Sequence, residues 1–270
     1  MEAPSFKEDH ISQIPALQML QNLGYTYLSP EEALSLRWGK TTGVILEDIL
    51  RKQLREINSI RTSSSRTSVF SDANIESGIY ALQNLPFGEG YISASEYVYN
   101  LLSLGKSLEQ SIDWDKRSFN LRYIDWENPA NNVFHVTEEF SVMRTGSKEQ
   151  YRPDIVLFVN GIPISVIECK RPDMKDPLDQ AISQHLRNQQ DDGIRSLYVY
   201  GQLLLSIGTD SAKYATLATP EKFWAEWHEK FETKEDEENY KNEIVRIRNT
   251  PLSEEKKAVL FTERFRYVRS

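Results

Sequence analysis

Two carboxylates and a lysine, Asp154, Glu168 and Lys170, border two apolar segments in the middle of the chain. Such a set suits a hard divalent cation, because Mg²⁺ prefers oxygen ligands, commonly takes one or two carboxylates and keeps water in its other positions. The ion would polarise a phosphoryl oxygen and lower the pKa of a bound water, while the ammonium stabilises charge building on the phosphate. On spacing alone, a surface hairpin with an incidental Glu–Lys pair is an equally good interpretation.

The apolar segments predict the two strands of a hairpin, since a pair typical of tight turns separates two runs rich in β-branched residues. The strands and turn are residues 155–159, Asn160-Gly161 and residues 162–167. Side chains alternate along a strand, so Glu168 and Lys170 share one face and Cys169 takes the other.

The position of Asp154 depends on the turn. A two-residue turn places Asp154 opposite Ile167, on the other face from the second acid. A three-residue turn with Gly161 as a bulge places it opposite Val166, and all three polar groups then share a face. The sequence permits both, and a metal cluster requires the bulged turn or an equivalent bend near Pro153.

The residues around these positions resemble a known family. Pro153-Asp154 followed by Glu168-Cys169-Lys170 is similar to the PD-(D/E)xK nuclease signature, and the wider match resembles the nuclease domain of type I restriction enzyme R (motor) subunits. This wider match takes in Arg152-Pro153-Asp154-Ile155-Val156, Asn160-Gly161-Ile162-Pro163, Val166-Ile167-Glu168-Cys169-Lys170, Tyr123-Ile124-Asp125-Trp126-Glu127-Asn128-Pro129 and Asn131-Asn132-Val133-Phe134-His135-Val136. The resemblance is dense over residues 120–227 and thin on either side.

The resemblance implies an α/β fold, with a mixed central β-sheet flanked by helices in a restriction-endonuclease-like core and a helical N-terminal part. It also implies Mg²⁺, for which Mn²⁺ can substitute, held by Asp154, Glu168 and the backbone carbonyl of Cys169. Lys170 would assist the attacking water, and Gln184 on the following helix would position phosphate or water.

Two further positions complete the set that the resemblance implies. The family's Gln-x-x-x-Tyr motif matches Gln184 here, but Asn188 stands where tyrosine is expected, which puts that tyrosine's stacking or hydrogen-bonding role in doubt. An acid on the first helix would complete the metal site, and Glu8 is the candidate. Glu8 is also the third-position acid of a capping box that starts at Ser5, which is the structural alternative.

The resemblance implies a Mg²⁺-dependent endonuclease that cuts duplex DNA, coupled in the full protein to ATP-driven translocation. Its partners would be DNA, the methyltransferase and specificity subunits, and the protein's own C-terminal translocase. ATP would belong to the full-length protein alone, because Gly39-Lys40-Thr41 and Gly105-Lys106-Ser107 lack the first glycine of a Walker A loop. The alternatives are a stand-alone PD-(D/E)xK repair or junction nuclease and a nuclease-like interaction scaffold.

Composition fits a cytoplasmic enzyme fragment with no membrane segment. At 270 residues and 39% hydrophobic, the chain can bury a full core. A single cysteine rules out a disulfide framework, and one thiol with four scattered histidines makes a zinc site a poor interpretation. The net charge of −8 disfavours strong DNA binding by this chain alone, since phosphate neutralisation drives that binding. Basic patches at Arg51, Arg55, Arg61 and Arg66, or at Lys175 and Arg187, could still steer DNA.

We expect three parts: a helical part at residues 1–118 that contributes the first helix of the fold, a nuclease core at 119–228, and a charged helical extension at 229–270. Helices are expected near residues 5–23, 44–57, 71–84, 94–104, 177–190 and 229–243, with a short one that opens at Ser29-Pro30 and another from Thr219-Pro220. Strands are expected near residues 119–124, 133–142, 154–159, 163–169, 196–200 and 203–208. The helix after Lys170 predicts a parallel crossover and therefore a mixed sheet.

Overall fold

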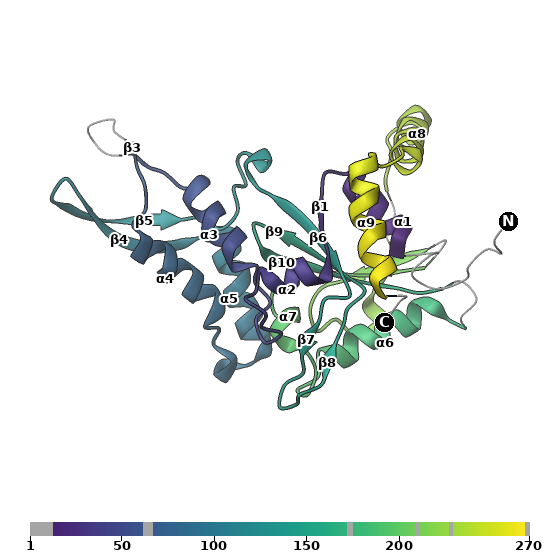
Figure 1. Cartoon of the computed structure of the whole chain (residues 1–270), viewed down its shortest axis with the longest axis horizontal. Helices are drawn as coiled ribbons and strands as arrows, with labels where there is room; N and C mark the ends of the chain where they lie inside the picture. The colour runs from purple at the N-terminus through teal and green to yellow at the C-terminus, as the bar shows by residue number, and fades with distance from the viewer. Residues whose placement is uncertain (1–12, 62–66, 172–174, 209–210, 227–228, 268–270) are drawn as a thin grey trace.

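The structure is a computed structural model that describes residues 13–61, 67–171, 175–208, 211–226 and 229–267, with side chains described as far as residue 260. Its centre is a seven-stranded sheet in the order β1-β6-β9-β10-β11-β12-β13 (Figure 1). These strands are β1 Thr26–Leu28, β6 Phe134–Glu138, β9 Ile155–Val159, β10 Ile162–Cys169, β11 Leu203–Ile207, β12 Ala212–Ala215 and β13 Ala225–Glu226.

The sheet is mixed, as the sequence predicts. The β1–β6 and β10–β11 pairs are parallel, and the other pairs are antiparallel. The β10–β11 crossover passes through α6 Pro177–Asn188 and α7 Arg195–Tyr198, because parallel neighbours need a connection long enough to return to the same edge.

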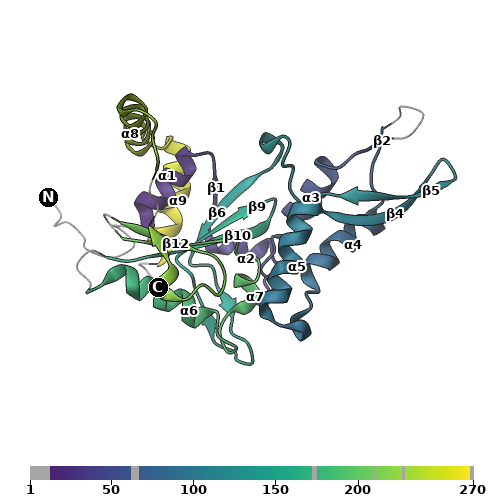
Figure 2. The same cartoon turned by 180° about the vertical axis from the view of Figure 1, so that it is seen from behind.

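Each face of the sheet packs against its own helices. Val156, Phe158 and Val166 belong to one hydrophobic core that reaches α6 and the N-terminal helices. On the other face, Ile155, Leu157, Ile167 and Cys169 pack with residues of α1 Ile14–Asn22 and α9 Glu254–Tyr267, notably Leu17 and Leu260. Figure 2 shows the same arrangement from behind. Because neither face of β9 and β10 is open to water, both strands have nearly continuous apolar sequences.

The N-terminal part adds helices and an extended hairpin. The helices are α2 Pro30–Ser35, α3 Glu47–Glu56, α4 Asp72–Gln83 and α5 Tyr91–Leu104. The Ser29 hydroxyl accepts the Glu32 N–H, and the Glu32 carboxylate accepts the Ser29 N–H, so α2 begins with a capping box. Strands β4 Lys106–Ile112 and β5 Asp115–Leu121 form a separate hairpin that extends away from the central sheet (Figure 1).

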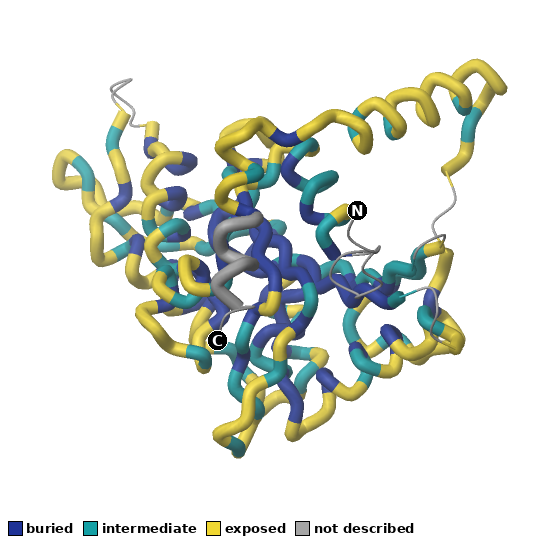
Figure 3. The backbone as a smooth tube through the Cα atoms, turned by 45° about the vertical axis from the view of Figure 1, so that its right-hand side comes forward, coloured by how far each residue is buried: buried dark blue, intermediate teal, exposed yellow. Residues whose placement is uncertain are grey.

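Smaller elements complete the described chain. They are two-stranded pairs β2 Ile60–Arg61 with β3 Thr67–Ser68 and β7 Val142–Met143 with β8 Gln150–Tyr151, the short 3₁₀ helices η2 Phe87–Glu89, η3 Pro129–Asn131 and η4 Glu221–Phe223, and α8 Lys234–Asn249. Helix α8 has no buried residue and is exposed along its length (Figure 3), in agreement with the charged helix expected near 229–243. No helix within the described ranges is both long and apolar enough to cross a membrane.

Three expectations for secondary structure are wrong. Residues 196–200 form a helix and turn instead of a strand. This short run is apolar and mostly buried, so its sequence shows neither the alternation of a strand nor the 3.6-residue repeat of a helix, and the pattern cannot distinguish the two. The strand expected at 119–124 ends at Leu121 and pairs with β4 outside the central sheet. The helix expected from Thr219-Pro220 is only the single turn η4, which β13 follows directly after Trp224.

Candidate functional site

The turn between β9 and β10 is a two-residue turn, and a bulge follows it. Val159 pairs with Ile162, and Asn160 and Gly161 both have positive φ (53° and 82°), as a type I′ turn requires. The register then shifts between Pro163 and Ser165. The turn is therefore the shorter of the two alternatives considered, with the bulge inside β10 rather than in the turn.

This bulge brings the two acids to one face. Beyond it Ile167 pairs with Ile155, so the next step of the ladder places Glu168 opposite Asp154. Directly opposed residues in an antiparallel pair point to the same side of the sheet. The extra residue at Ile164 thus produces the shared face that the sequence could assign only to a three-residue turn or a bend near Pro153.

The turn itself is pinned by buried amides. The Asn160 side chain donates to the Tyr123 carbonyl (2.9 Å) and to Asn132 Oδ1 (2.8 Å) and accepts the Val133 N–H (2.9 Å). Asn132 in turn accepts the Asp125 N–H at 2.9 Å. The asparagines upstream of the hairpin therefore hold the turn that sets the register of the site, and have a structural role.

Asp154 and Lys170 converge on the end of β10. Asp154 Oδ2 accepts the Cys169 N–H at 2.7 Å and lies 3.8 Å from Lys170 Nζ. Lys170 Nζ donates to the Cys169 carbonyl at 3.0 Å, and only 8% of the residue is exposed. The Cys169 side chain points to the opposite face and is fully buried. Its peptide group therefore links the acid and the lysine.

Glu168 is the least solvated member of the site. It is 0% exposed, and no donor among the described residues reaches either carboxylate oxygen. Burial is the main cause that raises the pKa of Glu168 well above its usual range, and the charge of Asp154 is the next. A buried carboxylate without donors is costly to ionise unless a cation joins it.

These residues fit a hard divalent cation. Asp154 and Glu168 supply carboxylate oxygens, and the Cys169 carbonyl has a second lone pair beside the one that accepts Lys170. Within the described ranges, no third His, Cys, Asp or Glu side chain completes a metal-binding group with them. The remaining positions would therefore be filled by water or substrate, as Mg²⁺ commonly allows.

Gln13, immediately before α1, is a site residue that sequence reasoning missed. Its amide Nε2 donates to Glu138 Oε2 (3.0 Å) and to the Asp154 carbonyl (3.1 Å), and the residue is buried. The Tyr27 hydroxyl donates to the other oxygen of Glu138 at 2.7 Å. A glutamine followed by Pro15 carries no chemical signal of its own, and its contacts are over 120 residues away in sequence. Glu8, the first-helix acid expected here, lies outside the described residues.

The other expected positions lie on α6. Gln184 is half-buried, and within the described chain its side chain makes no hydrogen bond to the three residues of the site. Asn188 is buried and donates to the Tyr198 hydroxyl at 3.3 Å. His185 contacts the same hydroxyl through Nδ1 (2.9 Å) and the Leu205 carbonyl through Nε2 (3.0 Å). The position where tyrosine was expected thus lies beside a tyrosine from another helix.

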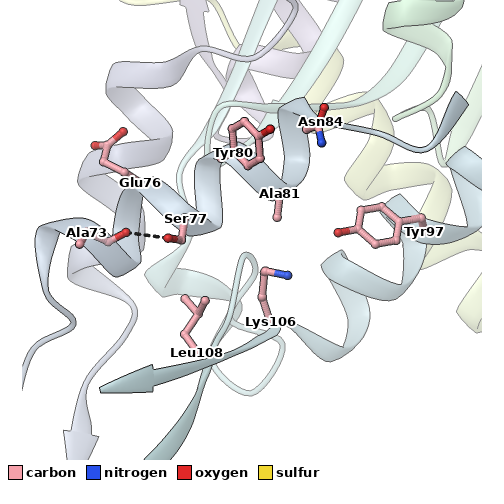
Figure 4. A pocket seen from close by; sticks show the side chains of 9 residues that line it. All are labelled: Ala73, Glu76, Ser77, Tyr80, Ala81, Asn84, Tyr97, Lys106 and Leu108. Carbon is pink, nitrogen blue, oxygen red and sulfur yellow. Dashed lines mark hydrogen bonds between the residues drawn. The ribbon is translucent and has the colours of Figure 1, made fainter. Parts of the chain in front are cut away.

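One open cavity lies away from this site. A cavity of about 580 Å³ lies between α4, α5 and β4 (Figure 4), far along the chain from Asp154 and lined by Ala73, Glu76, Ser77, Tyr80, Ala81, Asn84, Tyr97, Lys106 and Leu108. It contains no acid from the hairpin, and its single carboxylate, Glu76, is paired with Arg51 at 2.7 Å. None of the candidate site residues lines this cavity.

Comparison with known proteins places the whole arrangement in a family. The chain is 29% identical over 229 residues to the type I restriction enzyme HindI endonuclease subunit of Haemophilus influenzae, covering 82% of this chain and 20% of the relative. It is also 29% identical over 266 residues to a Methanocaldococcus jannaschii protein that carries the name type I restriction enzyme MjaIXP endonuclease subunit, covering 93% of this chain and 24% of the relative. The chain thus spans at most about a quarter of the length of these relatives.

Residues 5–223 match the family described as type I restriction enzyme R protein N terminus. This match includes the pinned turn, the bulged hairpin, both acids, the lysine and α6. It begins at residue 5 and so also covers the N-terminal part, where the resemblance read from the sequence is thin. The chain therefore belongs to the family of N-terminal regions of type I restriction enzyme R proteins.

Proposed function

We propose that this chain is the nuclease domain of a type I restriction enzyme, of the PD-(D/E)xK class, and hydrolyses phosphodiester bonds of duplex DNA with Mg²⁺. The observation that carries the proposal is Glu168, a fully buried carboxylate with no donor among the described residues, which the register places opposite Asp154 and near Lys170. A purely structural cluster would satisfy Glu168 with hydrogen-bond donors, because an unsatisfied buried carboxylate destabilises the fold.

The three residues have separate tasks in this proposal. Asp154 and Glu168 hold the cation, which when bound supplies a polarised phosphoryl oxygen and a more acidic water. The Cys169 N–H donates to one oxygen of Asp154 and so fixes the orientation of its carboxylate. Lys170, held by the Cys169 carbonyl, presents an ammonium where negative charge builds on the phosphate. Gln184 would position the phosphate or the attacking water once DNA is bound.

The rest of the enzyme lies outside the part that this chain represents. ATP-driven translocation, the methyltransferase and specificity subunits, and recognition of a DNA sequence are proposed for the longer protein in which such a domain works. The net charge of −8 supports delivery of the domain to DNA by those other parts, since an acidic domain attracts phosphates poorly.

Calorimetric titration with Mn²⁺ tests the metal site directly. We expect the unmodified chain to bind Mn²⁺ and Asp154→Ala to lose this binding. Asp154→Asn should also lose it, although its amide oxygen can still accept the Cys169 N–H and preserve the fold. The matched control is Asp115→Ala, which removes an exposed acid of the β4–β5 hairpin. No Mn²⁺ binding by the unmodified chain, or equal binding by Asp154→Asn, would contradict the metal site and favour an interaction scaffold.

A further inference from the structure

Two guanidinium groups lie near the ring of Tyr151. The Cζ atom of Arg144 is 4.7 Å from the ring centroid, and the Cζ atom of Arg187 is 5.5 Å from it. Both distances allow a favourable cation–π contact, which orients the guanidinium against the ring. Tyr151 ends β8, three residues before Asp154, so the ring lies next to the proposed metal site in the chain.

The two arginines differ in their other partners. Arg144 bonds Glu149 (2.5 Å) and Asp192 (2.7 Å), so its charge is neutralised by two carboxylates. Arg187 is exposed, and no carboxylate of the described chain pairs with it. Arg144 is therefore a structural group, whereas Arg187 retains a charge that is open to a ligand.

The backbone of Arg187 is held in place by α6. His185, two residues earlier, is fully buried, contacts the Leu205 carbonyl and the Tyr198 hydroxyl, and lies 5.2 Å from the Trp224 ring. These contacts anchor the buried side of the helix against β11, and Arg187 projects from the exposed side. The Arg187 guanidinium is oriented by the Tyr151 ring, and its helix is fixed by buried contacts. Its side chain therefore loses little conformational entropy when it binds a ligand.

Arg187 also lies on α6, which packs against β10, the strand that carries Glu168 and ends at Cys169. The other candidate basic patch differs. Arg51 pairs with Glu76 at 2.7 Å and Arg55 with Asp72 at 3.0 Å, so neither has an unopposed charge. Near the acids of the hairpin, Arg187 is thus a cation suited to an anionic ligand.

We propose that Arg187, oriented by Tyr151, binds a backbone phosphate of duplex DNA adjacent to the phosphate that is cut. The planar guanidinium matches phosphate oxygens in a bidentate manner, which an ammonium cannot do. The proposal rests on the proposed nuclease function, since it places this phosphate relative to the scissile one. It assigns Arg187 to binding DNA and gives it no part in bond cleavage.

Fluorescence anisotropy with a labelled duplex, in EDTA and at several low salt concentrations, tests this assignment. One lost phosphate contact lowers the slope of log K against log salt by about 0.9. We therefore expect Arg187→Gln to reduce the slope by about that amount and to weaken binding by roughly threefold or more at low salt. Tyr151→Phe keeps the aromatic ring, so we expect nearly unchanged DNA affinity. Tyr151→Leu removes the ring, so we expect part of the loss of affinity seen for Arg187→Gln.

The matched control is Arg246→Gln, which removes the same charge from α8, where Arg246 pairs with Glu243. An equal loss in both variants, an unchanged slope for Arg187→Gln, or no DNA binding by the unmodified chain at low salt would overturn the assignment. Mn²⁺ calorimetry on Arg187→Gln separates the two proposals, because we expect its metal binding to be unchanged. If the unmodified chain binds no Mn²⁺ while Arg187→Gln still lowers the slope, the phosphate contact stands and the nuclease proposal fails.

Discussion

Asp154 lies in register with Glu168, one step beyond the Ile155–Ile167 pair of β9 and β10, although a regular hairpin with the same two-residue turn would place it opposite Ile167. The difference is one extra residue, Ile164, in β10. A one-residue change of register moves every following side chain to the other face of a strand. The bulge therefore decides whether the two acids can share a cation, and it lies next to the site, as β-bulges often do.

Lys170 should be needed for cleavage and not for the motor. In a longer protein that includes the translocase, we expect Lys170→Ala to lower DNA cleavage by roughly 10²–10³, because such groups act on charge that develops in the transition state. ATP hydrolysis and translocation should persist. A nicking assay and an ATPase assay on the same preparation measure both, and joint loss of the two activities would make the lysine structural or part of coupling.

Gln13 should connect stability to metal binding. Gln13→Ala removes a donor from buried Glu138 and from the Asp154 carbonyl, which costs about 1–3 kcal/mol for an unsatisfied buried group. We expect a lower melting temperature together with weaker Mn²⁺ binding. Gln18→Ala is the control, since that half-buried side chain makes a single long contact of 3.4 Å to the Thr250 carbonyl. Lower stability with unchanged Mn²⁺ affinity would show that Gln13 does not position Asp154.

His185 should make the fold sensitive to acid. Burial lowers the pKa of His185 from 6.5 to about 4, so the unfolded chain binds this proton at a higher pH than the folded chain. The neutral imidazole therefore contributes its full stability above pH 6.5, and this contribution is lost as the pH falls towards 4, by about 3 kcal/mol in total.

Melting curves of the unmodified chain and His185→Gln between pH 7.5 and 4 measure this contribution. We expect the two melting temperatures to differ by a constant amount above pH 7 and to converge as the pH falls, because the glutamine has no proton to bind. Other buried groups change both proteins alike, so the difference isolates His185. A constant difference over the whole range would exclude His185 as a source of acid sensitivity.

The chain alone should bind duplex DNA weakly. With a net charge of −8 we expect a dissociation constant no lower than about 10⁻⁵ M near physiological salt, the weak end of ordinary non-specific binding, and little or no cutting. Anisotropy at two salt concentrations and a nicking assay in Mg²⁺ measure both properties. Tight, salt-resistant binding with robust cleavage would instead favour a self-sufficient repair nuclease.

The sequence predicts the parts of the site that are close together along the chain. The hairpin, the shared face of Glu168 and Lys170, the helix after them and the mixed sheet follow from strand alternation, a turn pair and a crossover. The bulge at Ile164 could not be predicted, because it changes no residue type. Gln13 could not be found either, since its role comes from tertiary contacts. The strand predicted at residues 196–200 is wrong for a related reason. A short apolar segment that is buried on all sides shows no repeat by which helix and strand can be distinguished.

The single cysteine of the chain is a built-in reporter on the strand that supports the proposed chemistry. The Cys169 thiol is fully buried beneath α1 and α9, while its peptide group contacts both Asp154 and Lys170. A thiol reagent can reach the sulfur only when β10 separates from these helices, so the labelling rate measures how often this strand opens. Comparing the labelling rate with and without Mn²⁺ would show how much a ligand on one face of the sheet slows exposure of the opposite face, where the thiol lies.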